Sequence, residues 1–96
     1  MKLKNTTTEI VKDEQGAKMN YVDFCNTCLN VLPQGGLDVS EMKSRLDVKI
    51  ALDKANGSID FTTKAQVETL KNCVKSMKWA IIHSDVIDFT EAVEKL

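Results

Sequence analysis

Several features that mark common protein classes are scarce or absent in this chain of 96 residues. One proline and four glycines are too few for a low-complexity linker or a collagen-like repeat. The longest apolar cluster, residues 79–82 (WAII), is far too short to span a bilayer or to form the core of a signal peptide. We therefore expect a single domain over residues 1–96, located in the cytoplasm and without membrane contact.

The chain also lacks a charge excess and the motifs of common enzymes. Thirteen basic and fourteen acidic residues give a formal net charge of −1. A dedicated nucleic-acid binder usually has a marked basic excess, because neutralised phosphates supply most of its affinity. His83 is the single histidine, no serine or cysteine nucleophile lies between glycines, and no glycine-rich phosphate loop follows a strand. We therefore predict a protein that is not an enzyme.

What is present is a set of signals for a small, mainly helical α+β domain. A segment rich in β-branched residues, a turn at residues 13–16 (DEQG) and a short return predict a β-hairpin within residues 1–19. Four residues able to cap a helix each precede apolar residues at helical spacing: Asn20, Asp38, Thr63 and Ser84. The helices expected after them, about four in all, cover residues 20–32, 38–56, 63–82 and 85–95.

The apolar spacing also predicts the buried faces. The face of the helix over 20–32 runs from Tyr21 to Leu32. In the helix over 38–56 one apolar row lies beside another; the first row is Met42, Leu46 and Ile50, and the second is Val48, Leu52 and Ala55. Alternation of polar and apolar residues at 58–61 predicts a short third strand that pairs with the hairpin and buries Ile59 or Phe61.

Three cysteines and the histidine allow one metal hypothesis. Cys25 and Cys28 have CxxC spacing, and with Cys73 and His83 they would supply a ligand set known from structural zinc sites. However, both cysteines continue the apolar period of a helix, where a free cysteine behaves as a small hydrophobe. The odd number of cysteines fits a reducing compartment. We predict core cysteines without metal or cofactor, with a zinc-stabilised module and a redox-active pair as alternatives.

A stripe of lysines is the most suggestive charge pattern. Lys64, Lys71, Lys75 and Lys78 fall on one side of a helix, and the last helix is acidic. Mutual screening between neighbouring solvated helices is one interpretation. A second is a pair of patches that steer the docking of a partner or subunit. Nucleic-acid binding by the helix over 63–77 is a third, which the lack of aromatic residues along the stripe disfavours.

Trp79 and Ile82 follow the lysine stripe directly. A tryptophan near a helix break is often core packing, but tryptophan is also enriched at the centre of interfaces. The candidate partner-binding residues are therefore Lys71, Lys75, Lys78, Trp79 and Ile82. Two arrangements are compatible with this segment. One is a homodimer through this C-terminal region, and the other is packing of the same groups within one monomer.

The order of several segments along the chain is similar to that in a known family. Five of these segments are residues 1–3 (MKL), 12–16 (KDEQG), 30–32 (NVL), 42–45 (MKSR) and 55–62 (ANGSIDFT). With the capped lysine helix, they resemble a family of small proteins of similar length encoded by tailed bacteriophages and prophages. The resemblance includes no catalytic motif. It implies an accessory protein in the host cytoplasm that acts by protein–protein contact, as an assembly factor or as an inhibitor of a host protein.

Overall fold

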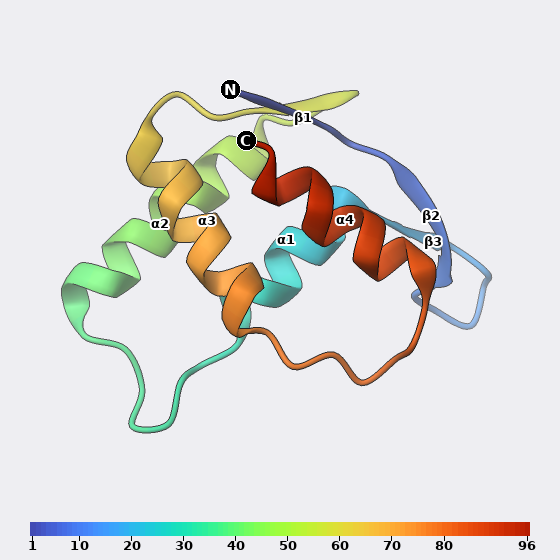
Figure 1. Ribbon diagram of the computed structural model, residues 1–96, viewed down its shortest axis with the longest axis horizontal. Coiled ribbons are helices and arrows are strands. Elements are labelled where there is room, and N and C mark those ends of the chain that lie inside the picture. Colours follow the sequence, from blue (N-terminus) through green and yellow to red (C-terminus); the bar gives the residue numbers. More distant parts are fainter.

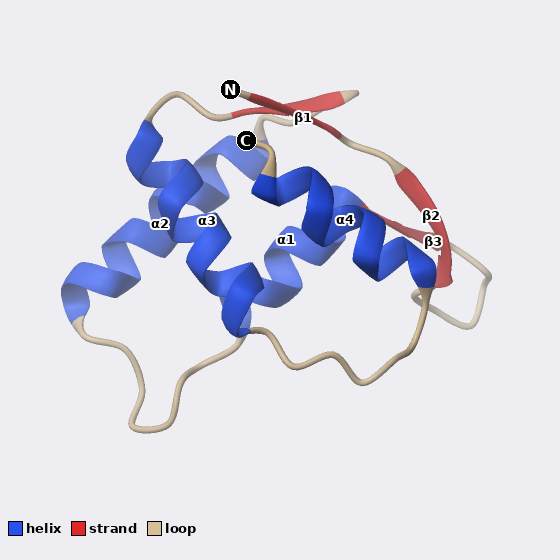
Figure 2. Ribbon diagram, in the orientation of Figure 1, coloured by secondary structure: helices blue, strands red, loops and turns tan.

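The strands form two small antiparallel sheets in a computed structural model that describes residues 1–96 (Figure 2). The four strands are β1 (Lys2–Lys4), β2 (Thr7–Val11), β3 (Lys18–Asn20) and β4 (Ser58–Asp60). Strands β2 and β3 form the predicted hairpin, with Thr7 opposite Asn20. The hairpin turns at Gly16, whose φ of 84° is a conformation that favours glycine.

The predicted third strand exists, but its pairing differs from the prediction. Strand β4 pairs with β1, with Leu3 opposite Ile59, and does not pair with the hairpin. At the outer edge of β2, a helix side chain takes the place of a strand: the Glu9 amide donates a hydrogen bond to Asp85 Oδ2 at 2.9 Å. Both Ile59 and Phe61 are buried, as the alternating pattern predicted.

Four helices complete the α+β fold that the sequence predicted. They are α1 (Tyr21–Asn30), α2 (Val39–Asp53), α3 (Lys64–Ser76) and α4 (Ser84–Glu94). Asn20, Asp38 and Thr63 cap the first three, each accepting a hydrogen bond from the amide three residues on. The cap of α4 is His83 and not Ser84, because His83 Nδ1 accepts from the Asp85 amide at 3.0 Å. None of the helices combines the length and the apolar composition that a membrane span requires.

Three helices end two or more residues earlier than predicted, and α4 ends one residue earlier, at Glu94. Helix α1 ends at Asn30 rather than at residue 32, since the residue before Pro33 disfavours the helical conformation, and Leu32 is exposed. Helix α2 ends at Asp53 rather than at residue 56. Helix α3 ends at Ser76 rather than at residue 82, and the chain over 77–83 is not helical.

Helix α3 lies at the centre of the helical part, where it contacts each of the other three helices. In Figure 1, α3 and α4 lie in front of α1 and α2, and the two small sheets cover the top and right of this arrangement. The buried side chains form one continuous hydrophobic cluster that includes residues from all four helices and from β1 and β4.

Four aromatic rings join α1, α4 and the segment that follows α3. The ring of Phe89 lies 5.1 Å from Tyr21, 5.2 Å from Phe24 and 6.2 Å from Trp79, in each case edge to face. The rings of Phe24 and Trp79 are 5.7 Å apart. Such offset contacts are the favoured geometry of aromatic pairs. The early end of α3 therefore allows Trp79 to reach α1 and α4.

Helix α2 is apolar on two opposite faces, and the prediction for its buried face was wrong in part. The buried residues are Val48, Ala51 and Leu52, whereas the predicted row Met42, Leu46 and Ile50 is exposed. A helix whose core-facing side is already apolar normally has charged and polar residues on the other side. The outer face of α2 departs from that pattern.

Candidate functional site

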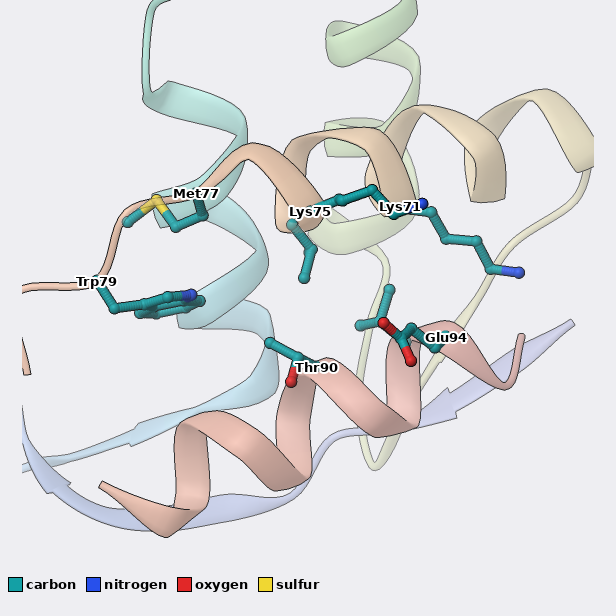
Figure 3. A pocket seen from close by; sticks show the side chains of 8 residues that line it. Lys71, Lys75, Met77, Trp79, Thr90 and Glu94 are labelled. Atoms are coloured by element: carbon teal, nitrogen blue, oxygen red, sulfur yellow. The ribbon is translucent and has the colours of Figure 1, made fainter. Parts of the chain in front are cut away.

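A cleft between α3 and α4 brings together three of the predicted partner-binding residues. Lys71, Lys75 and Trp79 line a cavity of about 490 Å³, and Lys78 and Ile82 do not. The other lining residues are Val74, Met77, Thr90, Val93 and Glu94. Figure 3 shows the lysines on the α3 side, Thr90 and Glu94 on the α4 side, and Trp79 at one end. The cleft thus combines an apolar base with charges of both signs.

The lysines of this cleft differ in their surroundings. Lys71 is half-buried, and its Nζ donates to the Leu96 carbonyl at 2.8 Å. Lys75 and Lys64 are exposed on the same helix, and Lys78 lies beyond its end. No ion pair joins the α3 lysines to the acidic residues of α4, although the two helices are in contact. The four lysines therefore do not form one uniformly exposed basic surface, because Lys71 is bonded within the chain.

Trp79 and Ile82 lie in different environments. The indole ring of Trp79 is half-buried and packs against Phe24 and Phe89 within the monomer. The side chain of Ile82, on the non-helical segment over 77–83, is fully exposed. Of these two candidate residues, only Ile82 is therefore freely available to a partner.

The cysteines lie in the core, and His83 has a structural contact. Burial raises the pKa of the Cys25 and Cys73 thiols, and burial together with nearby Cys73 raises the pKa of Cys28 to about 12. His83 Nδ1 accepts a hydrogen bond from the Asp85 amide at 3.0 Å and lies 3.6 Å from Asp85 Oδ2. No group of three or more histidine, cysteine or acidic side chains is placed to hold a metal ion.

We expect the cysteines to resist thiol reagents in the native protein. All three are free and buried, and burial holds the thiols protonated at about pH 8, where an exposed cysteine already reacts as its thiolate. A colorimetric disulfide reagent should label none of them within minutes, and all three after addition of guanidinium. Rapid labelling without denaturant would contradict the core position.

Four of the large exposed apolar residues lie elsewhere, on α2. Val39, Met42, Leu46 and Ile50 form a row on its outer face, and their side chains are 47–66% exposed. We call these four residues the outer stripe of α2. They continue onto the loop after α1, because Leu32 and Leu37 share a shallow cavity of about 250 Å³ with Met42 and Leu46. The apolar spacing of the sequence predicted three of these four residues, but as part of the buried face.

Two basic side chains of α2 hold the end of α1 beside this stripe. Arg45 Nη1 donates to the carbonyl oxygens of Leu29 at 2.9 Å and Val31 at 2.6 Å, and its Nε pairs with Glu41 Oε1 at 3.3 Å. Lys49 Nζ donates to Asn30 Oδ1. One side of the stripe is therefore a fixed junction between two helices. The role of Arg45 has no signal in the sequence, since the carbonyls that it binds are more than ten residues away.

A contiguous apolar surface that polar residues surround often marks a protein-binding site. The outer stripe, with Leu32 beside it, consists of exposed apolar side chains, whereas the lining of the α3–α4 cleft mixes apolar side chains with charges of both signs. Comparison of the chain with protein-family models, with curated proteins and with solved structures finds no match.

Proposed function

We propose that this chain is a non-enzymatic protein–protein interaction module and that the outer stripe of α2 is its binding surface. The observation that carries the proposal is the row of four large aliphatic side chains, each about half exposed, on a helix whose opposite face is buried. Single exposed aliphatic residues are ordinary on protein surfaces, but a row at helical spacing is the pattern of a helix that docks on a partner.

The anchoring of α2 supports this function. Val48 and Leu52 are buried on its inner face, and Gln66 Nε2 of α3 donates to the Asp47 carbonyl at 3.3 Å. Arg45 ties the same helix to the end of α1. Because α2 is formed and held before binding, a partner loses little free energy to ordering it.

The resemblance to small phage proteins favours a particular kind of module. An accessory protein of this kind acts by contact with phage or host proteins, either in assembly or as an inhibitor. The proposal therefore places the chain in the host cytoplasm with a protein partner and no cofactor.

We expect the chain to lose binding of its partner when a charge is introduced into the outer stripe. Leu46→Asp places a charge at the centre of the stripe, and Ile87→Asp places the same charge on α4, where Ile87 is also exposed. Affinity capture from host lysate followed by mass spectrometry should recover the same proteins with the native chain and with Ile87→Asp. Leu46→Asp should recover them at least tenfold less, a reduction of about 1.4 kcal/mol or more in binding free energy.

Both changes are on the surface, so each should leave the melting temperature almost unchanged. If Leu46→Asp is folded and still captures the same proteins in the same amounts, α2 is not the binding surface.

A further inference from the structure

The outer stripe of α2 is arranged so that it matches a second copy of itself. We propose that two copies of this chain associate through antiparallel contact of their α2 helices, about a two-fold axis that passes near Leu46. This inference rests on the proposed function and names a second copy of the chain as an occupant of the same surface. In a dilute capture experiment the copies separate, so the surface is free for another protein. The interface is distinct from the C-terminal region at residues 79–82 that the sequence suggested.

The spacing of the stripe fits a two-fold axis at Leu46. Met42 and Ile50 lie four residues on either side of it, so an antiparallel arrangement places Met42 of each copy against Ile50 of the other. Leu46 then meets Leu46 at the axis. All of these side chains are about half exposed in the monomer, and each contact except the central one occurs twice.

The charges beside the stripe are complementary in this arrangement. Lys43 and Asp47 are exposed on the same side of Leu46, at about 60° and 100° around the helix from it. Neither forms an ion pair in the monomer. In the antiparallel pair, Lys43 of one copy lies about 3 Å along the axis from Asp47 of the other, so two equivalent ion pairs form.

The opposite side of the stripe carries two cations, and the same geometry places Lys49 of one copy about 3 Å along the axis from Arg45 of the other. Both side chains are held within their own chain. Arg45 is already paired with Glu41 and bonded to α1 carbonyls, and Lys49 is bonded to Asn30. These side chains are therefore turned toward α1 of their own chain. The exposed charges that meet across the interface are those of Lys43 and Asp47.

The ends of α2 also favour antiparallel pairing. Asp53 is the last residue of α2, which has no basic residue in its last turn, so Asp53 lies at the negative end of its own helix dipole. Antiparallel pairing about Leu46 places Asp53 beside Val39 of the second copy, at the positive end of that helix. A carboxylate that is unfavourable in the monomer becomes favourable in the dimer.

The test is the mass of the chain as a function of concentration. The contact is one helix wide and smaller than the roughly 800 Å² per partner of a standard interface, so we expect a Kd of about 10–100 µM. Analytical ultracentrifugation should show the mass rising from 10.7 kDa toward twice that value over this range. Leu46→Asp should remain a monomer, and Ile82→Asp, which places the same charge at a fully exposed position, should dimerise like the native chain.

The two charges provide a sharper control. Lys43→Glu and Asp47→Lys should each weaken dimerisation about tenfold, because each places like charges opposite one another. An equal mixture of the two variants should recover the native affinity, since the glutamate introduced in one variant then faces the lysine introduced in the other across the interface. A change that only disturbed the monomer would not be rescued by mixing.

Three results would overturn the α2 dimer. The chain could stay a monomer up to about 500 µM, fivefold above the weakest expected Kd; dimerisation could persist in Leu46→Asp; or mixing the charge variants could fail to restore it. If the chain is a monomer but Leu46→Asp still abolishes capture from lysate, the interaction function stands and its partner is a different protein. Loss of dimerisation in Ile82→Asp alone would place the interface in the C-terminal region.

Discussion

Replacing Phe89 by alanine is expected to lower the free energy of unfolding by about 4 kcal/mol. Phe89 is fully buried, and its ring contacts the rings of Tyr21, Phe24 and Trp79. The change removes one of the two rings that contact all three others, the second being Phe24, and leaves a cavity between α1, α4 and the segment after α3. For a domain of this size, the melting temperature should fall by about 20 °C.

Chemical denaturation followed by circular dichroism measures this loss, and Ile87→Ala is the matched control. Ile87 is on the same helix but exposed, so its truncation should change the free energy of unfolding by less than about 0.5 kcal/mol. A loss below about 1 kcal/mol for Phe89→Ala, roughly a quarter of the expected value, would mean that the aromatic cluster contributes little to the core.

The N-terminal ends of the helices were predictable because their signals are local. Asn20, Asp38 and Thr63 each accept a hydrogen bond from an amide only three residues away, so the residue type and the spacing are enough to predict the contact. His83 replaces Ser84 as the cap of α4 because an imidazole nitrogen can accept the same bond. The observed cap is within one residue of the predicted position.

The end of α3 was not predictable from local signals. Residues 77–82 continue a plausible helical pattern, but the helix ends at Ser76 and Trp79 packs on Phe24 and Phe89 instead. This packing is stabilised by contacts with rings that lie elsewhere in the sequence. The periodicity of residues 63–82 therefore cannot predict where the helix ends. The pairing of β4 with β1 is a similar case, because the hairpin edge is bonded by Asp85.

The candidate site was predicted only in part, for a related reason. Lysines and a tryptophan in one segment are visible in the sequence, and the α3–α4 cleft does bring Lys71, Lys75 and Trp79 together. The outer stripe of α2 was assigned to the core because apolar residues at helical spacing normally face inward. Which apolar face is buried depends on contacts with α1 and α3, such as the one made by Arg45.

Arg45 is therefore the second residue at which we expect a large effect, and Arg45→Met should cost about 2–3 kcal/mol. Helix α1 has no basic residue in its own last turn, and Arg45 bonds the carbonyls of Leu29 and Val31 at its end. The Arg45 side chain is only 11% exposed. Methionine preserves the apolar stem but leaves these carbonyls without their donor. Urea denaturation measures the difference.

Two variants separate this role from a general effect of charge. Lys43→Met removes a cation from the exposed side of the same helix and should be nearly neutral for stability. Arg45→Lys keeps the charge but lacks the planar fork that reaches two carbonyls and Glu41 together, so it should recover less than half of the loss. Equal stability of Arg45→Met and Lys43→Met would instead show that water satisfies the end of α1. A difference of the expected size means that the Arg45 guanidinium stabilises the junction beside the outer stripe in addition to the contact of Lys49 with Asn30.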